Sequence, residues 1–165
     1  MGALDRRTDG PASRDYVSLS ANGRYVAFAS AQSGPLNVWI LDLETGKESP
    51  VAASSTMMQR FPVIGASGGG DEKTLLVFGG SPFQINLLDV ASHRQTTMLK
   101  HPRYSLVDAR FSPDNRWVSF TARIGPNRGW IMIAPIGGSN PVPESAWIRI
   151  AEEGAEDRAN WSPDG

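Results

Sequence analysis

Apolar residues along this chain gather in short runs, separated by segments rich in glycine, proline, asparagine and aspartate. Residues 25–28 and 75–78 form two such runs, and each is apolar at consecutive positions. A helix buried on one side would instead place its apolar residues three and four positions apart. The pattern therefore predicts an all-β protein of short strands, some of them buried on both faces.

The same order of segments recurs along the sequence. An apolar residue, then serine, any residue, and aspartate or asparagine occurs at Leu19, Phe111 and Trp161. A degenerate copy aligns near Ile64, so the anchors recur about every 45–50 residues, a period typical of propeller blades. The repeat predicts a partial β-propeller with about three four-stranded antiparallel blades and the start of another.

Each repeat is predicted to hold four strands. In the first copy they cover residues 16–20, 25–30, 37–43 and 48–52. A blade stacked between two others hides both faces of its sheet, and flat aromatic side chains suit the gap. We expect four tryptophans to fill such gaps rather than to stack on a ligand: Trp39, Trp117, Trp130 and Trp161.

The turns between the predicted strands carry suitable residues. Asn22 and Gly23 tolerate positive φ and can close a tight hairpin. In the third copy Pro113 presets φ at the second turn position. Gly46 lies at the tight point of the turn between the third and fourth strands of the first copy.

Aspartates recur at fixed places in the repeat. Asp42 and Asp89 end third strands, whereas Asp114 and Asp164 lie in the turn after the first strand. This recurrence predicts a structural task, in which the side chains accept hydrogen bonds from the turn backbone. An acid–base pair or a calcium site would require these carboxylates to converge in one pocket.

The repeat resembles the WD-like repeats of the TolB β-propeller family. That family's signature is an apolar residue or tryptophan followed by Ser-Pro-Asp-Gly, and later a turn of apolar-Asp-Leu-x-x-Gly. The signature residues of this chain are Leu19, Asn22, Gly23, Asp42, Gly46, Asp89, Phe111, Ser112, Pro113, Asp114, Trp161, Ser162, Pro163, Asp164 and Gly165. The first copy lacks the proline, and a glycine-rich stretch replaces the signature in the second copy.

The resemblance predicts that residues 1–165 form a single partial propeller. The expected blades are approximately residues 14–58, 59–103 and 104–152, with a partial blade at 153–165. Residues 3–6 are expected to be the last strand of an earlier blade. Since a closed propeller usually needs about four to eight blades, both ends are expected to fall within blades of a larger protein.

The resemblance implies protein–protein contact rather than catalysis. Similar propellers form sensor or interaction regions of larger bacterial proteins, including receptor-type kinases and transcriptional regulators, and residues 99–106 are similar to those proteins in particular. It also implies a periplasmic or other extracytoplasmic location, although the first residues do not read as a secretory signal. The expected contact surface is a rim of the loops 31–36, 79–83 and 124–129, which join second and third strands and should emerge on one face.

Two other functions fit the same fold. One is the gating propeller of a prolyl-oligopeptidase-like serine peptidase whose catalytic domain lies on sequence not present here. The other is a propeller enzyme such as a lyase or lactonase, which would place histidines or metal ligands near the central channel. His93 and His101 are the only histidines of the chain.

Composition narrows the alternatives. The net charge of −1 gives no sign of the basic stripe typical of nucleic-acid binders. The absence of cysteine excludes disulfides and cysteine metal sites. No apolar run approaches the roughly 18 residues expected of a membrane span. We therefore expect a protein partner, no nucleic acid and no membrane span in this chain.

Two motifs with catalytic potential are better explained by structure. Residues 65–69 fit the G-x-S-x-G pattern around Ser67, but no helix pattern follows, so a flexible hairpin is predicted. His93 and His101 lie in a turn and a linker without compact metal-ligand spacing, and both are expected to be solvated. The sequence assigns no catalytic, cofactor-binding or metal-binding residue.

The isolated chain is predicted to self-associate through its open blade faces. A partial ring leaves two apolar faces uncovered, whereas monomers rarely expose apolar patches above a few hundred Å². Light scattering on purified protein should therefore show dimers or larger species. A cooperatively folded monomer at high concentration would contradict this prediction.

Overall fold

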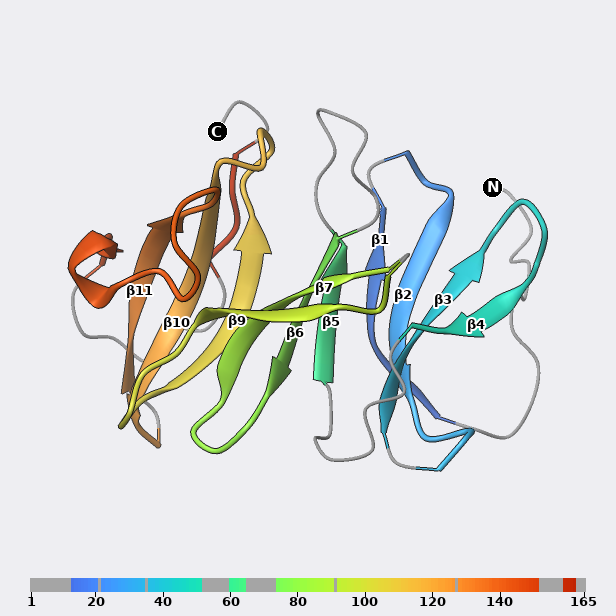
Figure 1. Cartoon of the computed structure of the whole chain (residues 1–165), viewed down its shortest axis with the longest axis horizontal. Coiled ribbons are helices and arrows are strands. Elements are labelled where there is room, and N and C mark those ends of the chain that lie inside the picture. The colour runs from blue at the N-terminus through green and yellow to red at the C-terminus, as the bar shows by residue number, and fades with distance from the viewer. Residues whose placement is uncertain are drawn as a thin grey trace, which may run out of the picture.

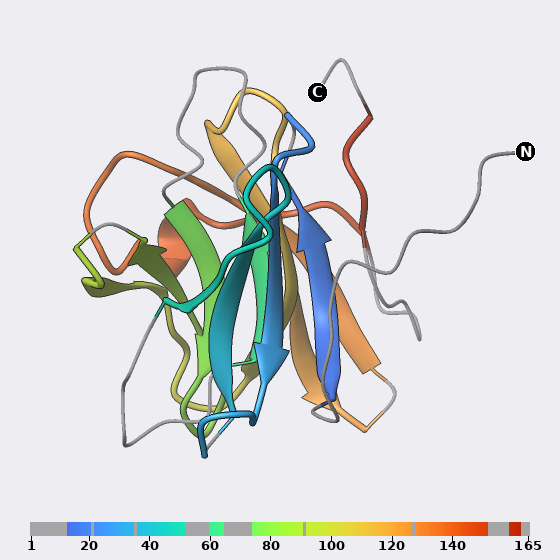
Figure 2. The same ribbon diagram turned by 90° about the vertical axis from the view of Figure 1, so that its right-hand side faces the viewer.

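The computed structural model describes residues 13–20, 22–34, 36–51, 60–64, 74–90, 92–126, 128–151 and 159–162. Their strands form three four-stranded antiparallel sheets, each joined in simple sequence order. Figure 1 shows the sheets side by side, and Figure 2, with the first sheet toward the viewer, shows them stacked one behind another. This is the architecture of successive blades in a β-propeller.

The first sheet holds β1 (Arg14–Leu19), β2 (Tyr25–Ser30), β3 (Asn37–Asp42) and β4 (Glu48–Pro50). The second holds β5 (Arg60–Ile64), β6 (Thr74–Gly79), β7 (Gln84–Asp89) and β8 (Gln95–Leu99). The third holds β9 (Ser105–Phe111), β10 (Trp117–Gly125), β11 (Arg128–Pro135) and β12 (Ile148–Arg149). The four strands predicted in the first repeat all form, with bounds that differ by at most two residues.

The helical content of the described residues is one short 3₁₀ turn, η1 (Glu144–Ala146), which precedes β12. Nothing helical in that part of the chain has the length and apolar character needed to cross a bilayer.

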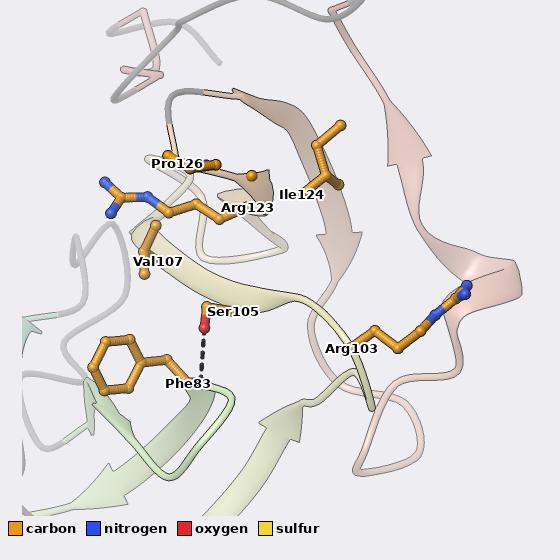
Figure 3. A pocket seen from close by; sticks show the side chains of 8 residues that line it. Phe83, Arg103, Ser105, Val107, Arg123, Ile124 and Pro126 are labelled. Carbon is orange, nitrogen blue, oxygen red and sulfur yellow. Dashed lines mark hydrogen bonds between the residues drawn. The ribbon is translucent and has the colours of Figure 1, made fainter.

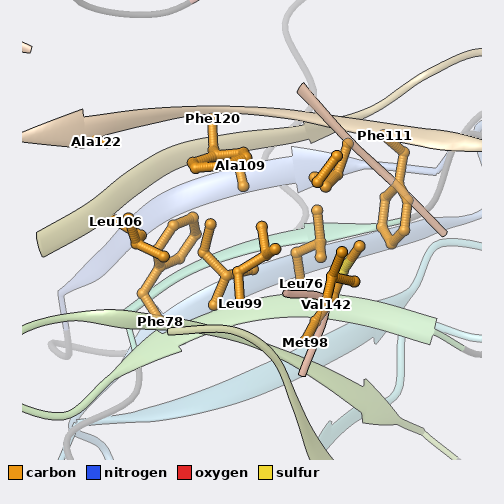
Figure 4. Packing of buried hydrophobic residues seen from close by; sticks show 13 residues of the cluster. Leu76, Phe78, Met98, Leu99, Leu106, Ala109, Phe111, Phe120, Ala122 and Val142 are labelled. Atoms are coloured by element: carbon orange, nitrogen blue, oxygen red, sulfur yellow. The ribbon is translucent and has the colours of Figure 1, made fainter. Parts of the chain in front are cut away.

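Both faces of β6 are buried, as the unbroken apolar run predicted. Leu75 and Val77 pack toward the first sheet, in a cluster with Ala27 and Ile40. The alternate residues of β6 pack toward the third sheet, in the larger cluster shown in Figure 4. Because neighbouring residues of a strand point to opposite faces, one strand contributes to both clusters. The second sheet is thereby held between the other two.

Phenylalanine, rather than tryptophan, fills the deepest positions. Phe28, Phe78 and Phe120 are each 1% exposed, whereas all four tryptophans expected there are only half-buried. The prediction for the tryptophans is therefore corrected. Phe78 and Phe120 lie in the cluster between the second and third sheets. Phe28 lies on the face of the first sheet opposite to Ala27, which packs toward the second sheet. Trp147, which the sequence did not single out, packs edge-on against Phe120 with ring centroids 5.1 Å apart.

The first strand of every sheet contains an irregularity in its pairing. The register shifts between Asp15 and Ser18 in β1 and between Arg60 and Val63 in β5, and β9 shifts opposite β10. Tyr16 in β1 and Asp108 in β9 both adopt positive φ at this place. A β-bulge adds one residue to a strand and re-aims its side chains. The three sheets therefore share an irregularity in the first strand as well as the same strand order.

The large apolar side chains that stay exposed in the described residues all lie on the first or the third sheet. They are Tyr16, Val17, Leu19, Ile148 and Ile150. Leu19 is 58% exposed, whereas Phe111, at the same place in the repeat, is 8% exposed. Phe111 belongs to the cluster between the second and third sheets, whereas Leu19 belongs to neither cluster of the described residues. Phe28, on the same face of the first sheet as Leu19, is nevertheless only 1% exposed.

Replacing Phe120 by alanine should reduce the free energy of unfolding by about 3–5 kcal/mol, because a fully buried ring is removed between two sheets. Urea unfolding followed by fluorescence measures this loss. Val17→Ala, at an exposed position, is the matched control and should change stability by less than about 0.5 kcal/mol. Equal midpoints for Phe120→Ala and the parent protein would show that the sheets do not pack face to face.

Candidate functional site

The loops that join second and third strands leave the three sheets on one side of the molecule. In Figure 1 the β2–β3, β6–β7 and β10–β11 connections all lie at the lower edge. These connections correspond to the predicted rim segments 31–36, 79–83 and 124–129. Antiparallel strands joined in sequence order produce this result, because every second connection returns to the same edge.

An open pocket of about 400 Å³ lies on this side, where the second and third sheets meet. Its walls come from the β6–β7 loop, from β9 and the residues before it, and from the β10–β11 hairpin (Figure 3). The lining residues are Phe83, Arg103, Ser105, Val107, Arg123, Ile124, Gly125 and Pro126. Two of the three predicted rim loops therefore contribute to one concave surface.

Two hydrogen bonds fasten the β6–β7 loop to β9 beneath the pocket. The backbone N–H of Phe83 donates to Ser105 Oγ at 3.2 Å, the contact drawn in Figure 3. The carbonyl oxygen of Phe83 accepts from the N–H of Leu106 at 2.8 Å. The backbone N–H and the carbonyl oxygen of Phe83 are thus both hydrogen-bonded to the third sheet. The pocket is built across a bonded junction between two sheets.

The β10–β11 hairpin is shaped by a local irregularity. Arg123 pairs with Gly129 and Gly125 pairs with Arg128, so Ile124 is the extra residue. Gly129 is required by packing, since a Cβ atom there would lie 2.7 Å from the Thr121 side chain. The bulge turns the end of β10 and brings its residues to the pocket wall.

The charged side chains at the pocket are arginines. Arg123 has a side chain that is 47% exposed, and its Nη2 lies 3.9 Å from Asp108 Oδ2. The guanidinium of Arg103 lies 5.5 Å from the centre of the Tyr104 ring, in cation–π geometry. No carboxylate is among the eight lining residues. The pocket lining therefore carries two arginines beside apolar residues, and the carboxylate of Asp108 lies close to one of them.

His101 is buried rather than solvated, which corrects the expectation from sequence. Its side chain is 5% exposed, and its ring stacks on Tyr104 at 4.0 Å with planes 3° apart. Its Nδ1 accepts hydrogen bonds from the N–H groups of Arg103 and Tyr104, at 3.2 and 3.0 Å. Nδ1 is therefore the unprotonated nitrogen, and Nε2 points at Glu144, 3.5 Å away. His101 thus shapes the segment that carries Arg103 to the pocket.

The signature residues of the three described sheets lie away from the pocket, in or next to turns at the opposite ends of the strands. In the third sheet Ser112 Oγ donates to Asp114 Oδ1 at 2.6 Å and accepts from the N–H of Trp117 at 3.0 Å. Asp114 Oδ1 also accepts from the N–H of Arg116 at 3.0 Å. Asn115 adopts positive φ. Serine and aspartate together close the hairpin.

The first sheet repeats this network with asparagine in place of aspartate. Ser20 Oγ donates to Asn22 Oδ1 at 2.7 Å and accepts from the N–H of Tyr25 at 2.8 Å. Asn22 Oδ1 accepts from the N–H of Arg24 at 2.9 Å, and Gly23 takes a φ of 73°. The requirement of the repeat is therefore a side-chain oxygen, not a charge.

The aspartates that end third strands accept hydrogen bonds within their own turns. Asp42 Oδ1 accepts from the N–H groups of Glu44 and Thr45, and its Oδ2 accepts from Arg24 at 2.9 Å. Asp89 Oδ1 accepts from both the N–H and the hydroxyl of Ser92. Within the described ranges, no three histidine or acidic side chains converge as a metal site would require.

These bonds change the titration of two carboxyls. The hydrogen bond from Arg24 lowers the pKa of Asp42, with smaller contributions from the turn N–H groups. The hydroxyl of Ser112, followed by the N–H of Arg116, lowers the pKa of Asp114. In both cases the donors stabilise the charged carboxylate.

Some predicted positions cannot be placed in the fold. Pro163, Asp164, Gly165 and the Ser67 motif lie outside the described residues. The indole N–H of Trp161 donates to the carbonyl oxygen of Arg110 in β9 at 3.2 Å. The segment after the third sheet thus returns to that sheet's first strand.

Neither a protein-family model nor a curated protein matches the sequence. Solved structures do match the fold. A putative TolB from Agrobacterium tumefaciens superposes with a TM-score of 0.68 at 14% identity, over 96% of this chain and 57% of that one. TolB from Acinetobacter baumannii gives a TM-score of 0.60 at 17% identity, over 78% of this chain and 31% of that one.

A prolyl endopeptidase structure gives a TM-score of 0.57 at 14% identity, over 82% of this chain and 22% of that one. This chain therefore spans less than two thirds of the length of each of these three proteins. At such identities the likeness establishes the fold, an all-β partial propeller similar to those of TolB and prolyl oligopeptidases.

Acid should destabilise the fold partly through Asp114. A carboxyl whose folded pKa lies below its ordinary value stabilises the fold above that value, and the contribution is lost as pH falls through the folded pKa. Asp114→Asn keeps an accepting oxygen, as Asn22 shows, but removes the titration. Urea unfolding at a series of pH values should therefore show a shallower loss of stability for Asp114→Asn below about pH 4.

Ser112→Ala serves as the comparison, because it removes the main donor to Asp114 and the acceptor for the Trp117 N–H. It should cost about 1 kcal/mol at neutral pH and also flatten the acid response. Identical pH dependence in the parent and both variants would contradict the assigned role of this turn.

Proposed function

We propose that this chain is part of a non-catalytic propeller that binds a protein partner on the side where second and third strands are joined. The observation that carries the proposal is the pocket between the second and third sheets, formed by two rim loops and held by the Phe83 bonds to β9. A partner that enters this pocket would contact both sheets at once.

The pocket has the features of a recognition surface on a rigid support. Its volume of about 400 Å³ would accommodate a few side chains of a partner. Pro126 is exposed and Phe83 is half-buried, so apolar surface is available at the mouth. Binding residues are commonly carried on loops that a stable scaffold positions.

The hydroxyl at the pocket supports binding rather than nucleophilic chemistry. Ser105 Oγ accepts a hydrogen bond from the backbone of Phe83, so it has a structural task between the two sheets. An activated serine would instead need a neighbouring base within hydrogen-bond reach, oriented by a third group. The eight lining residues include neither histidine nor carboxylate.

A second candidate function is the gating propeller of a serine peptidase. The superposition on a prolyl endopeptidase structure favours it, and this chain corresponds to 22% of that protein's length. In that case the catalytic serine, aspartate and histidine would lie in another domain. A longer reading frame that carries such a domain would decide for this alternative.

Changes in the three rim loops should reduce capture of the partner. We expect Gln32→Ala, Phe83→Ala and Pro126→Ala, combined in one protein, to lower recovery of the partner by about tenfold in a pull-down followed by mass spectrometry. Arg116→Ala, in an exposed turn at the other end of the third sheet, is the control and should leave recovery unchanged. A partner retained equally by all three proteins would refute the rim as the contact surface.

A further inference from the structure

The charges at the pocket indicate which partner chemistry it favours. Arg103 and Arg123 stand at opposite ends of the lining in Figure 3, and none of the lining residues is acidic. The rest of the lining is apolar apart from Ser105 and Gly125. In Figure 3 the two guanidiniums point away from each other, so an extended partner would meet them one at a time. An acidic side chain beside either would meet an opposite charge, and a basic one a like charge.

Arg123 can bind a carboxylate in addition to its present neighbour. The Nη2 atom is 3.9 Å from Asp108 Oδ2, and nearly half of the side chain is exposed. A guanidinium carries five N–H donors in a planar fork that suits a carboxylate. Asp108 lies in the bulge of β9 and has a largely buried side chain, so its carboxylate provides a fixed opposite charge near the guanidinium.

Arg103 is positioned by two contacts with neighbouring residues of its own segment. His101 fixes the backbone of this segment by accepting the N–H of Arg103, and the guanidinium lies over the ring of Tyr104. An arginine stacked on an aromatic ring keeps its N–H edge available to a ligand. Ser105 Oγ uses a lone pair toward the Phe83 N–H, so that bond leaves the hydroxyl hydrogen available as a donor.

The attraction for acidic groups is confined to the pocket. The chain as a whole carries a net charge of −1, so it has no general attraction for polyanions. Apolar side chains flank the donors, with Val107 buried at the floor and Ile124 and Pro126 at the wall. An acidic residue beside an apolar one matches both parts of this surface.

We propose that the pocket recognises an extended acidic–apolar segment of a protein partner, with its carboxylates directed at Arg103 and Arg123. This inference rests on the proposed function and specifies the partner of the same site.

Fluorescence anisotropy with labelled synthetic peptides tests the proposal on the full chain. The probe is the capped peptide Leu-Glu-Leu-Glu-Leu, compared with the same peptide carrying glutamine or lysine in place of glutamate. The glutamate peptide should bind at least about tenfold more tightly than the other two, and its affinity should fall as salt rises.

Arg123→Gln and Arg103→Gln should each weaken binding of the glutamate peptide by about five- to tenfold. Arg116→Gln, an exposed arginine at the opposite end of the third sheet, is the matched control and should have no effect. Circular dichroism establishes that each variant is folded before its affinity is compared.

The outcomes separate this inference from the function on which it rests. Equal binding of the three peptides, no binding at millimolar concentration, or an effect of Arg116→Gln equal to that of Arg123→Gln would overturn the acidic-segment proposal. Equally tight binding of a single-stranded DNA of the same charge would assign the site to polyanions instead. If any of these results is obtained while the rim-loop variant still loses the captured partner, the proposed partner-binding function stands. The partner would then be recognised by something other than acidic side chains.

Discussion

The structure depends on the burial of both faces of its central sheet. β6 supplies alternate residues to two separate clusters, so the first and third sheets pack against opposite sides of one strand. Hydrogen bonds within each sheet determine its strand order, but only this packing places one sheet beside the next. The pocket exists because that packing brings the β6–β7 loop against β9, where backbone bonds then lock the contact.

Much of the fold was predictable because the same sequence pattern occurs in several copies along the chain. Short apolar runs, the spacing of the anchors and the turn residues agree on four strands per unit, and the first repeat forms them nearly as expected. The serine and the asparagine or aspartate of the signature act locally, within five residues, so their hydrogen bonds follow from the sequence alone. The side on which the rim loops emerge follows from the antiparallel strand order.

The candidate site was less accessible to such reasoning, because it depends on contacts between distant segments. The rim loops were identified, and residues 99–106 stood out by resemblance, but that Arg103, Ser105 and Val107 line a pocket together with two rim loops was not predicted, because this depends on contacts between sheets. His101 was expected in solvent because it stands beside a proline in a linker; stacking on Tyr104 and two backbone donors keep it buried. The burial of Phe78 and Phe120 likewise depends on the packing of the second sheet against the third, which no local pattern specifies.

The attachment of Phe83 to β9 also has a mechanical meaning. One residue contributes both its N–H and its carbonyl oxygen to the neighbouring sheet, so a tilt between the two sheets must stretch both bonds together. The concave surface above would change shape with such a tilt, because its walls belong to different sheets. Binding at this surface and the rigidity of the contact between the second and third sheets are therefore coupled. A molecule bound there would contact both sheets and restrict their relative motion.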